Sequence, residues 1–196
     1  MHFGEPFGGI LPGPRGAVLS ILLRTDAALT GRQIHRLLSD TYSLWSVQET
    51  LRVLARLGLV ETQVIGRAGV HKINEEHVAV PSLRALVDPI ADLKQVVAAA
   101  AGPQARTVLL FGSIARGEST AASDIDLAVI APADWDLGTQ LADVVKRRLG
   151  NACDVLVFTA EEFDDRARDG EPVVSDILRD GVALVGTKPR LKLGAA

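Results

Sequence analysis

The sequence predicts an α+β protein built of two parts in tandem. Between residues 15 and 58 apolar residues recur at spacings of three and four, as on one face of a helix. From residue 107 onward short apolar runs alternate with amphipathic segments, which predicts a short mixed sheet flanked by helices. A chain of 196 residues is long enough for two small domains. We expect an irregular arm at 1–14, a first domain at 15–80, a second domain at 81–188 and a frayed tail at 189–196.

The first part begins with a Gly- and Pro-rich stretch and continues as three helices and a hairpin. The arm is expected to be irregular because Gly and Pro break both helices and strands. Helices are predicted at 17–25, at 31–38 with Thr30 as N-cap, and at 43–57 with Ser43 as N-cap and Gly58 as terminator. Two short strands at 59–65 and 70–73 then form a hairpin around the tip 66–69.

Three helices followed by a hairpin resemble a winged helix-turn-helix domain, which implies DNA binding. The helix 43–57 would then be the recognition helix, and the hairpin the wing. The residues that this resemblance offers to DNA are Trp45, Ser46, Gln48 and Arg52 on that helix, Arg67 at the hairpin tip, and Arg32 and Arg36 on the preceding helix. The alternative is a helical module used for dimerisation or domain packing. Residues 1–80 carry a net charge of only +1, and Glu49 lies on the supposed reading face, so charge supports DNA binding weakly.

The second part follows a junction at 74–90, in which Pro81 and Pro89 interrupt the pattern. An Ala-rich helix is predicted at 90–101, and Gly102-Pro103 ends it. Strands at 107–111, 125–130 and 154–158 are separated by a short helix and by an amphipathic helix at 136–149. An acidic segment at 161–169 precedes a last helix at 173–179.

One motif in this second part indicates chemistry. Gly112 and Ser113 directly follow the apolar run 107–111, and Asp124 and Asp126 come ten residues later. Residues i and i+2 of a strand point to the same face, so both carboxylates project together while Ile125 points to the core. Paired carboxylates repel each other unless a cation lies between them, and Mg²⁺ prefers such oxygen ligands. Gly112 permits close backbone approach, and Ser113 offers a hydroxyl and an N–H to a phosphate.

The motif Gly112-Ser113, ten residues, Asp124-Ile-Asp126 resembles the nucleotidyltransferase superfamily that includes DNA polymerase beta, and especially its minimal members. The resemblance implies a third carboxylate on a neighbouring strand, for which Asp154 fits. It also implies transfer of a nucleoside monophosphate from an NTP, with ATP expected, to a hydroxyl group. Asp124, Asp126 and Asp154 would hold one or two Mg²⁺ ions, and Gly112, Ser113 and Arg116 would bind the nucleotide. A surface role for Arg116 is the alternative.

The same resemblance implies a role in a toxin–antitoxin pair, with a partner toxin protein or a tRNA as acceptor. The winged helix would then repress its own operon, and a palindromic operator would favour a homodimer. A second hypothesis is a transcription regulator whose nucleotidyltransferase domain only senses a nucleotide. A third is a small-molecule nucleotidyltransferase acting on an antibiotic, which is disfavoured because only about forty residues follow Asp154.

Composition bounds these functions. The single cysteine, Cys153, excludes a disulfide within the chain and is expected to pack rather than react. There is no Cys/His pattern of zinc spacing. No signal peptide is recognisable, and the longest apolar runs are far shorter than a membrane span. We therefore expect a soluble cytoplasmic protein without membrane partners.

Overall fold

The computed structural model describes residues 1–189, and the chain divides into two compact units. The first unit is Glu5–Pro89, and the second comprises Met1–Gly4 together with the chain from Ile90 onward. The expected domain boundary at residue 80 therefore differs from the division seen here, because the segment 80–89 packs with the first unit. Met1–Gly4, expected to be part of an irregular arm, packs with the second. Residues 190–196 of the predicted tail lie outside the described residues.

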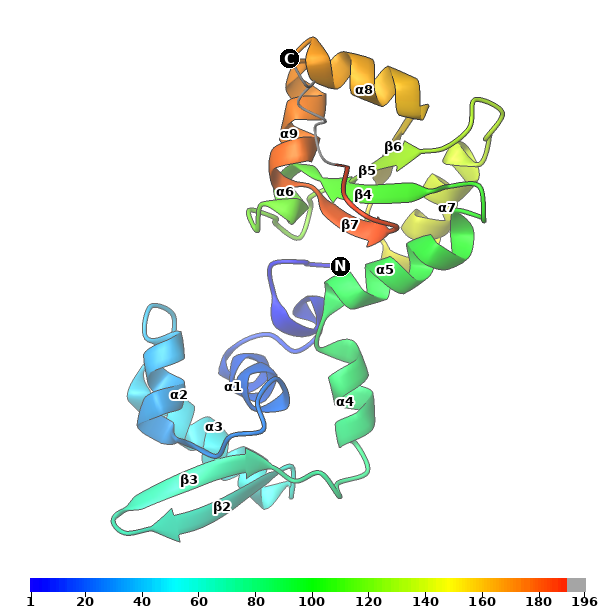
Figure 1. Cartoon of the computed structure of the whole chain (residues 1–196). Coiled ribbons are helices and arrows are strands. Elements are labelled where there is room, and N and C mark those ends of the chain that lie inside the picture. The colour runs from blue at the N-terminus through cyan, green and yellow to red at the C-terminus, as the bar shows by residue number, and fades with distance from the viewer. Residues whose placement is uncertain (190–196) are drawn as a thin grey trace. The chain divides into compact units, whose positions relative to one another are not determined.

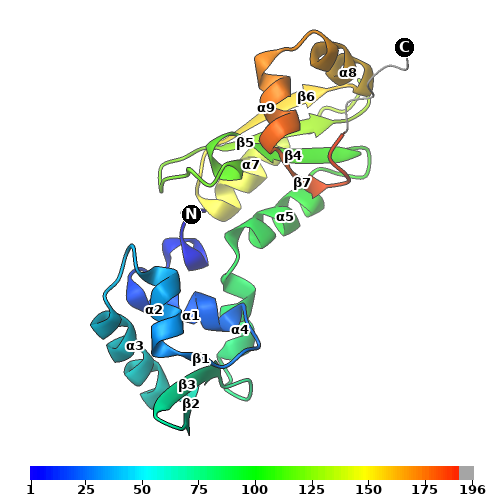
Figure 2. The same ribbon diagram turned by 60° about the vertical axis from the view of Figure 1, so that its left-hand side comes forward.

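The first unit contains short helices and a small antiparallel sheet (Figures 1 and 2). The strands are ordered β1-β3-β2, with every neighbouring pair antiparallel. The elements are η1 (Pro6–Gly9), α1 (Pro14–Leu23), β1 (Leu29–Thr30), α2 (Gly31–Leu38), α3 (Leu44–Arg56), β2 (Val60–Ile65), β3 (Ala68–Ile73) and α4 (Val80–Leu86). The three predicted helices and the hairpin are confirmed, to within three residues at each end, whereas β1 and α4 were not predicted as separate elements.

Local chemistry explains where the helices of this unit begin. Thr30 accepts a hydrogen bond from the Gln33 amide, and the Gln33 side chain accepts one from the Thr30 amide, which is a capping box. Ser43 likewise accepts a hydrogen bond from the Ser46 amide, as expected for an N-cap. The apolar faces of α1, α2 and α3 meet in one core that includes Leu22, Ile34, Leu51 and Leu54, all at most 2% exposed.

The second unit is built around a mixed sheet flanked by helices, which confirms the fold class predicted for this part. The sheet order is β6-β5-β4-β7; β5 and β6 are parallel, and the other two pairs are antiparallel. The elements are α5 (Pro89–Ala100), β4 (Thr107–Phe111), α6 (Gly112–Ala115), β5 (Ile125–Ile130), α7 (Gly138–Leu149), β6 (Cys153–Phe158), α8 (Ala160–Arg168), α9 (Pro172–Asp180) and β7 (Val182–Val185).

Both faces of this sheet are covered (Figure 1). Ile125, Leu127 and Val129 of β5 face a core formed with α5 and α7, whereas Ala128 and Ile130 face a core formed with α8 and α9. Since β5 is covered on both sides, its residues are almost all apolar, and Asp126 is the single charged residue in the strand. Two elements had no sequence prediction: α8, read only as an acidic segment, and β7. None of the helices within residues 1–189 is long and apolar enough to cross a membrane.

Candidate functional site

Strand register brings two of the three predicted carboxylates side by side. In the parallel pair β5–β6, Asp126 lies opposite Asp154, so both side chains project from the same face of the sheet. Asp124 immediately precedes β5 and is exposed, whereas Asp126 is half-buried and Asp154 exposed. On the other side of β5, Asp126 lies opposite Phe111, the last residue of β4. The motif residues therefore gather at one end of three adjacent strands.

Gly112 lies directly against the Asp126 carboxylate. Its φ of +72° is a conformation that residues with a side chain rarely adopt. A Cβ atom at this position would lie 2.1 Å from Asp126 Oδ2 and 3.0 Å from Asp126 Cγ, far inside van der Waals contact. Only glycine therefore allows the turn after β4 and the Asp126 carboxylate to occupy their observed places. Ser113 follows in the short helix α6 and is half-buried.

The charges around Asp126 are unbalanced. Burial raises the pKa of Asp126 above its usual value, the negative charges of Asp154 and Asp124 raise it further, and Arg116 opposes them. Carboxylate oxygens are the ligands that Mg²⁺ prefers, so the donor set and its excess negative charge fit a divalent cation. Across the described part of the chain, however, no three His, Cys, Asp or Glu side chains stand close enough to hold one ion. The predicted metal ligands are neighbours without forming an assembled coordination shell.

Arg116 lies at the C-terminal end of α6, and acidic side chains surround it. Its Nε donates a hydrogen bond to Glu118 Oε2 at 2.8 Å, and this bond is the main reason that the pKa of Arg116 is raised. Asp176 and Asp180 of α9 also raise the pKa of Arg116. The guanidinium is exposed and is already paired, so binding to a phosphate would require it to exchange a partner.

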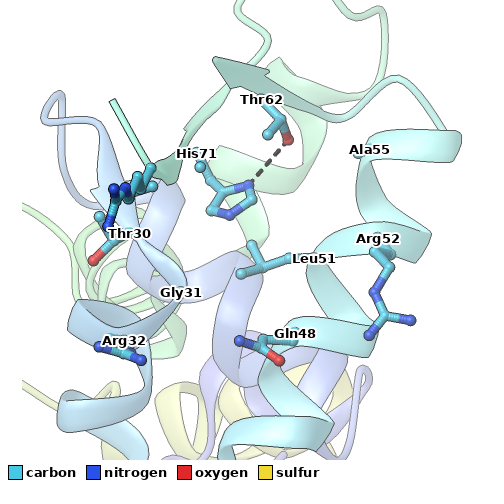
Figure 3. Close-up of a pocket in the computed structure, with 12 residues that line it drawn as sticks. Thr30, Gly31, Arg32, Gln48, Leu51, Arg52, Ala55, Thr62 and His71 are labelled. Atoms are coloured by element: carbon cyan, nitrogen blue, oxygen red, sulfur yellow. Dashed lines mark hydrogen bonds between the residues drawn. The ribbon is translucent and has the colours of Figure 1, made fainter. Parts of the chain in front are cut away.

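The first unit contains a pocket of about 720 Å³ between the start of α2, one face of α3 and the β2–β3 hairpin (Figure 3). Four of the residues predicted to bind DNA line it: Arg32, Gln48, Arg52 and Arg67. The other three, Arg36, Trp45 and Ser46, are not among its lining residues. Trp45 is 70% exposed, as expected for a residue that does not belong to the core.

Sequence reasoning missed part of this pocket. Thr62 and His71 are directly opposite in the hairpin, and a hydrogen bond of 3.0 Å joins Thr62 Oγ1 to His71 Nδ1. Burial lowers the pKa of His71, which favours its neutral form. The two-residue periodicity of paired strands places residues 62 and 71 on one face of the hairpin, and this pattern could have predicted from the sequence that they lie together. Arg52 is not free either, because its guanidinium is paired with Glu49 on the same helix.

Comparison with known proteins agrees with the geometry of the second unit. Residues 93–185 match the family model described as "Polymerase beta, Nucleotidyltransferase", from within α5 to the end of β7, and this stretch includes all the motif residues. The second unit thus contains a polymerase beta nucleotidyltransferase domain, and the protein is a nucleotidyltransferase. No curated protein matches the chain.

Two solved structures are similar to part of the chain. One is a toxin–antitoxin with AMP-PNP, which is 24% identical with a TM-score of 0.38, over 50% of this chain and 74% of that one. The other is a mutant of the toxin–antitoxin MntA–HpeT, which is 21% identical with a TM-score of 0.37, over the same shares of each chain.

Proposed function

We propose that the second unit transfers a nucleoside monophosphate from an NTP, with ATP as the expected substrate, to a hydroxyl group of a macromolecule. The observation that carries this proposal is the pairing of Asp126 with Asp154 across β5 and β6, with Gly112 packed against the Asp126 carboxylate. The three residues lie within the nucleotidyltransferase domain. A half-buried carboxylate with raised pKa between two further carboxylates is the arrangement expected of a cation site.

In this proposal, Asp124, Asp126 and Asp154 hold one or two Mg²⁺ ions. A cation held there would supply charge neutralisation for the triphosphate and for the oxygens of an in-line displacement. The turn at Gly112 lets the backbone approach the phosphates closely, and Ser113 donates its hydroxyl and amide to them. Arg116 adds a charge-assisted hydrogen bond on exchanging Glu118 for a phosphate oxygen.

The bond changes are those of any nucleotidyl transfer. The acceptor oxygen forms a bond to the α-phosphorus, the bond from that phosphorus to the bridging oxygen breaks, and pyrophosphate leaves with the bonding electron pair. The hydroxyl proton passes to solvent base. Positioning and electrostatic stabilisation supply most of the catalysis in such reactions. Asp154, exposed beside Asp126, would help hold the second metal ion or lower the pKa of the attacking hydroxyl.

We further propose that the first unit is a winged helix-turn-helix domain that binds DNA, with α3 as the recognition helix and the β2–β3 hairpin as the wing. Its support is the order of three helices followed by an antiparallel hairpin, and the pocket between α3 and the hairpin, which three arginines line. Arg32, Arg52 and Arg67 would contact phosphates, while Gln48 reaches a base edge. Such a domain would allow the protein to repress its own operon. For the transferase of the second unit, the acceptor would be a partner toxin protein or a tRNA.

The experiment that tests the transferase is label transfer from each α-³²P NTP, with Mg²⁺, into a fractionated cell lysate. A labelled protein or RNA should appear with the wild type and be absent with Asp126→Asn. A label equally strong with both proteins would refute the assignment of the site.

The alternative function is a transcription regulator whose nucleotidyltransferase domain only senses a nucleotide. The two functions differ in what a nucleotide does. Sensing requires that Mg-ATP change the affinity for DNA, and that Asp126→Asn remove this change. Transfer requires turnover, which a sensor lacks.

A further inference from the structure

The first four residues of the chain pack into the second unit, although Glu5, the next residue, belongs to the first unit. The Met1 amino group donates hydrogen bonds to Leu149 O at 3.1 Å and to Asn151 Oδ1 at 2.6 Å. Met1 and Phe3 contact the core between the sheet, α5 and α7. We call this segment, Met1–Gly4, the N-terminal strap.

Asn151 joins the strap to the loop that carries Asp124. Its side chain is 6% exposed, and its Nδ2 donates to Met1 O at 2.9 Å and to Ser123 O at 3.0 Å. Together with the bond from the Met1 amino group, the Asn151 side-chain amide therefore makes three hydrogen bonds, two with Met1 and one with Ser123. A buried amide that is satisfied in this way has a single orientation and transmits the position of one segment to the other.

These bonds fix the backbone on both sides of Asp124. The carbonyl held by Asn151 belongs to the peptide group between Ser123 and Asp124. The next peptide group is held as well, because the Ile125 amide donates to Ala152 O at 2.8 Å. Since peptide groups are planar, anchoring both of them leaves Asp124 little freedom beyond its side chain. The strap adds one contact on the same loop, between His2 Nε2 and Ser119 O at 3.1 Å.

We propose that Asn151 is a positioning residue for Asp124, and that the strap holds Asn151 in place. This inference rests on the proposed function, because it assumes that Asp124 binds a divalent cation. Asn151 acts through its hydrogen bond to the Ser123 carbonyl and is not itself a proposed metal ligand. Losing a residue that orients a metal ligand lowers metal affinity roughly 10- to 100-fold in other proteins, so Asn151→Ala should weaken cation binding about tenfold.

The test is a Mn²⁺ titration followed by electron paramagnetic resonance, in the presence of a non-hydrolysable ATP analogue. It compares the wild type with Asn151→Ala, Asp126→Asn and a control, Asn74→Ala. Asn74 is matched because its side chain also braces backbone, donating to Gly58 O at 2.9 Å, but in the other unit. We expect an affinity about tenfold weaker for Asn151→Ala, no binding for Asp126→Asn, and wild-type affinity for Asn74→Ala.

A second variant and a second measurement cover the case in which Asn151→Ala fails to fold. His2→Ala removes only the contact with Ser119 and should still weaken Mn²⁺ binding measurably. Hydrogen exchange of the amides in residues 118–124, measured without metal, should be faster in both variants than in the wild type.

The outcomes separate this inference from the proposed function. Wild-type Mn²⁺ affinity and wild-type exchange in both variants, with binding lost in Asp126→Asn, would overturn the inference alone. No Mn²⁺ binding by the wild type would overturn the proposed function, and the positioning role with it.

Discussion

Replacing Gly112 with alanine separates the cost of backbone strain from damage to the site. The new Cβ would lie 2.1 Å from Asp126 Oδ2, and an ordinary contact begins at about 3.4 Å. The carboxylate must therefore move by about 1.3 Å, or the turn must move instead. The positive φ adds a cost of roughly 1–2 kcal/mol, because alanine in the left-handed region is strained.

Gly117→Ala is the matched control. Gly117 has a φ of +73°, nearly that of Gly112, but nothing lies within 4 Å of the position of its Cβ. The positive φ should lower the free energy of unfolding of both variants by roughly 1–2 kcal/mol, and the close contact with Asp126 adds a further loss in Gly112→Ala alone. Only Gly112→Ala should also displace Asp126, and a misplacement of about 1 Å can cost about 100-fold in rate.

The assay is the rate of label transfer from the α-³²P NTP, measured beside urea unfolding of both variants. We expect a loss of about 100-fold for Gly112→Ala and near wild-type activity for Gly117→Ala, with both variants folded under the conditions of the assay. Equal activity in the two variants would show that the close contact between Gly112 and Asp126 has no catalytic consequence.

Three further predictions concern single side chains. Asp126→Asn should stabilise the protein at pH 7, because the raised pKa of Asp126 shows that its ionised form is unfavourable in the folded state. This gain should vanish as the pH falls below about 4, where the wild-type carboxyl is protonated in both the folded and the unfolded state. Melting temperatures of both proteins, measured against pH, test this prediction. Burial, and then the negative charges of Asp154 and Asp126, raise the pKa of Cys153 to about 12. Cys153 should therefore react with a disulfide reagent at pH 8 roughly a thousand times more slowly than an unfolded control, and a fast reaction in the native protein would contradict this shift. Arg32→Ala and Arg67→Ala should each reduce the salt dependence of DNA binding by about one unit of slope, whereas Arg84→Ala, on α4 and paired with Glu75, should leave it unchanged in the same filter-binding series.

Most helices and strands could be predicted because their signals are local. Thr30 and Ser43 cap helices through hydrogen bonds to residues three positions away, which a sequence shows directly. The helix α8 has the same signal, since Thr159 and Glu162 form a capping box, but its acidic composition and single buried residue, Phe163, hid it. β1 and β7 depend on pairing with distant strands, and neither has a periodicity of its own.

The candidate site was predictable where spacing alone placed its members. Two aspartates two residues apart share a face of any strand, so Asp124 and Asp126 followed from the pattern. Asp154 could be predicted only from the family resemblance, because the register between β5 and β6 depends on how the intervening helix α7 packs on the sheet. No spacing could show that Asn151 holds the loop before Asp124, since its partners are Met1, 150 residues away, and Ser123.

The most direct test of the central claim is a crystal structure of the protein with Mn²⁺ and a non-hydrolysable ATP analogue, with the metal located by its anomalous scattering. We predict a metal peak at roughly 2.0–2.4 Å from carboxylate oxygens of Asp124 and Asp126, with Asp154 beside it and the triphosphate against the Gly112-Ser113 turn. Nucleotide bound elsewhere, or bound here without metal at these carboxylates, would contradict it.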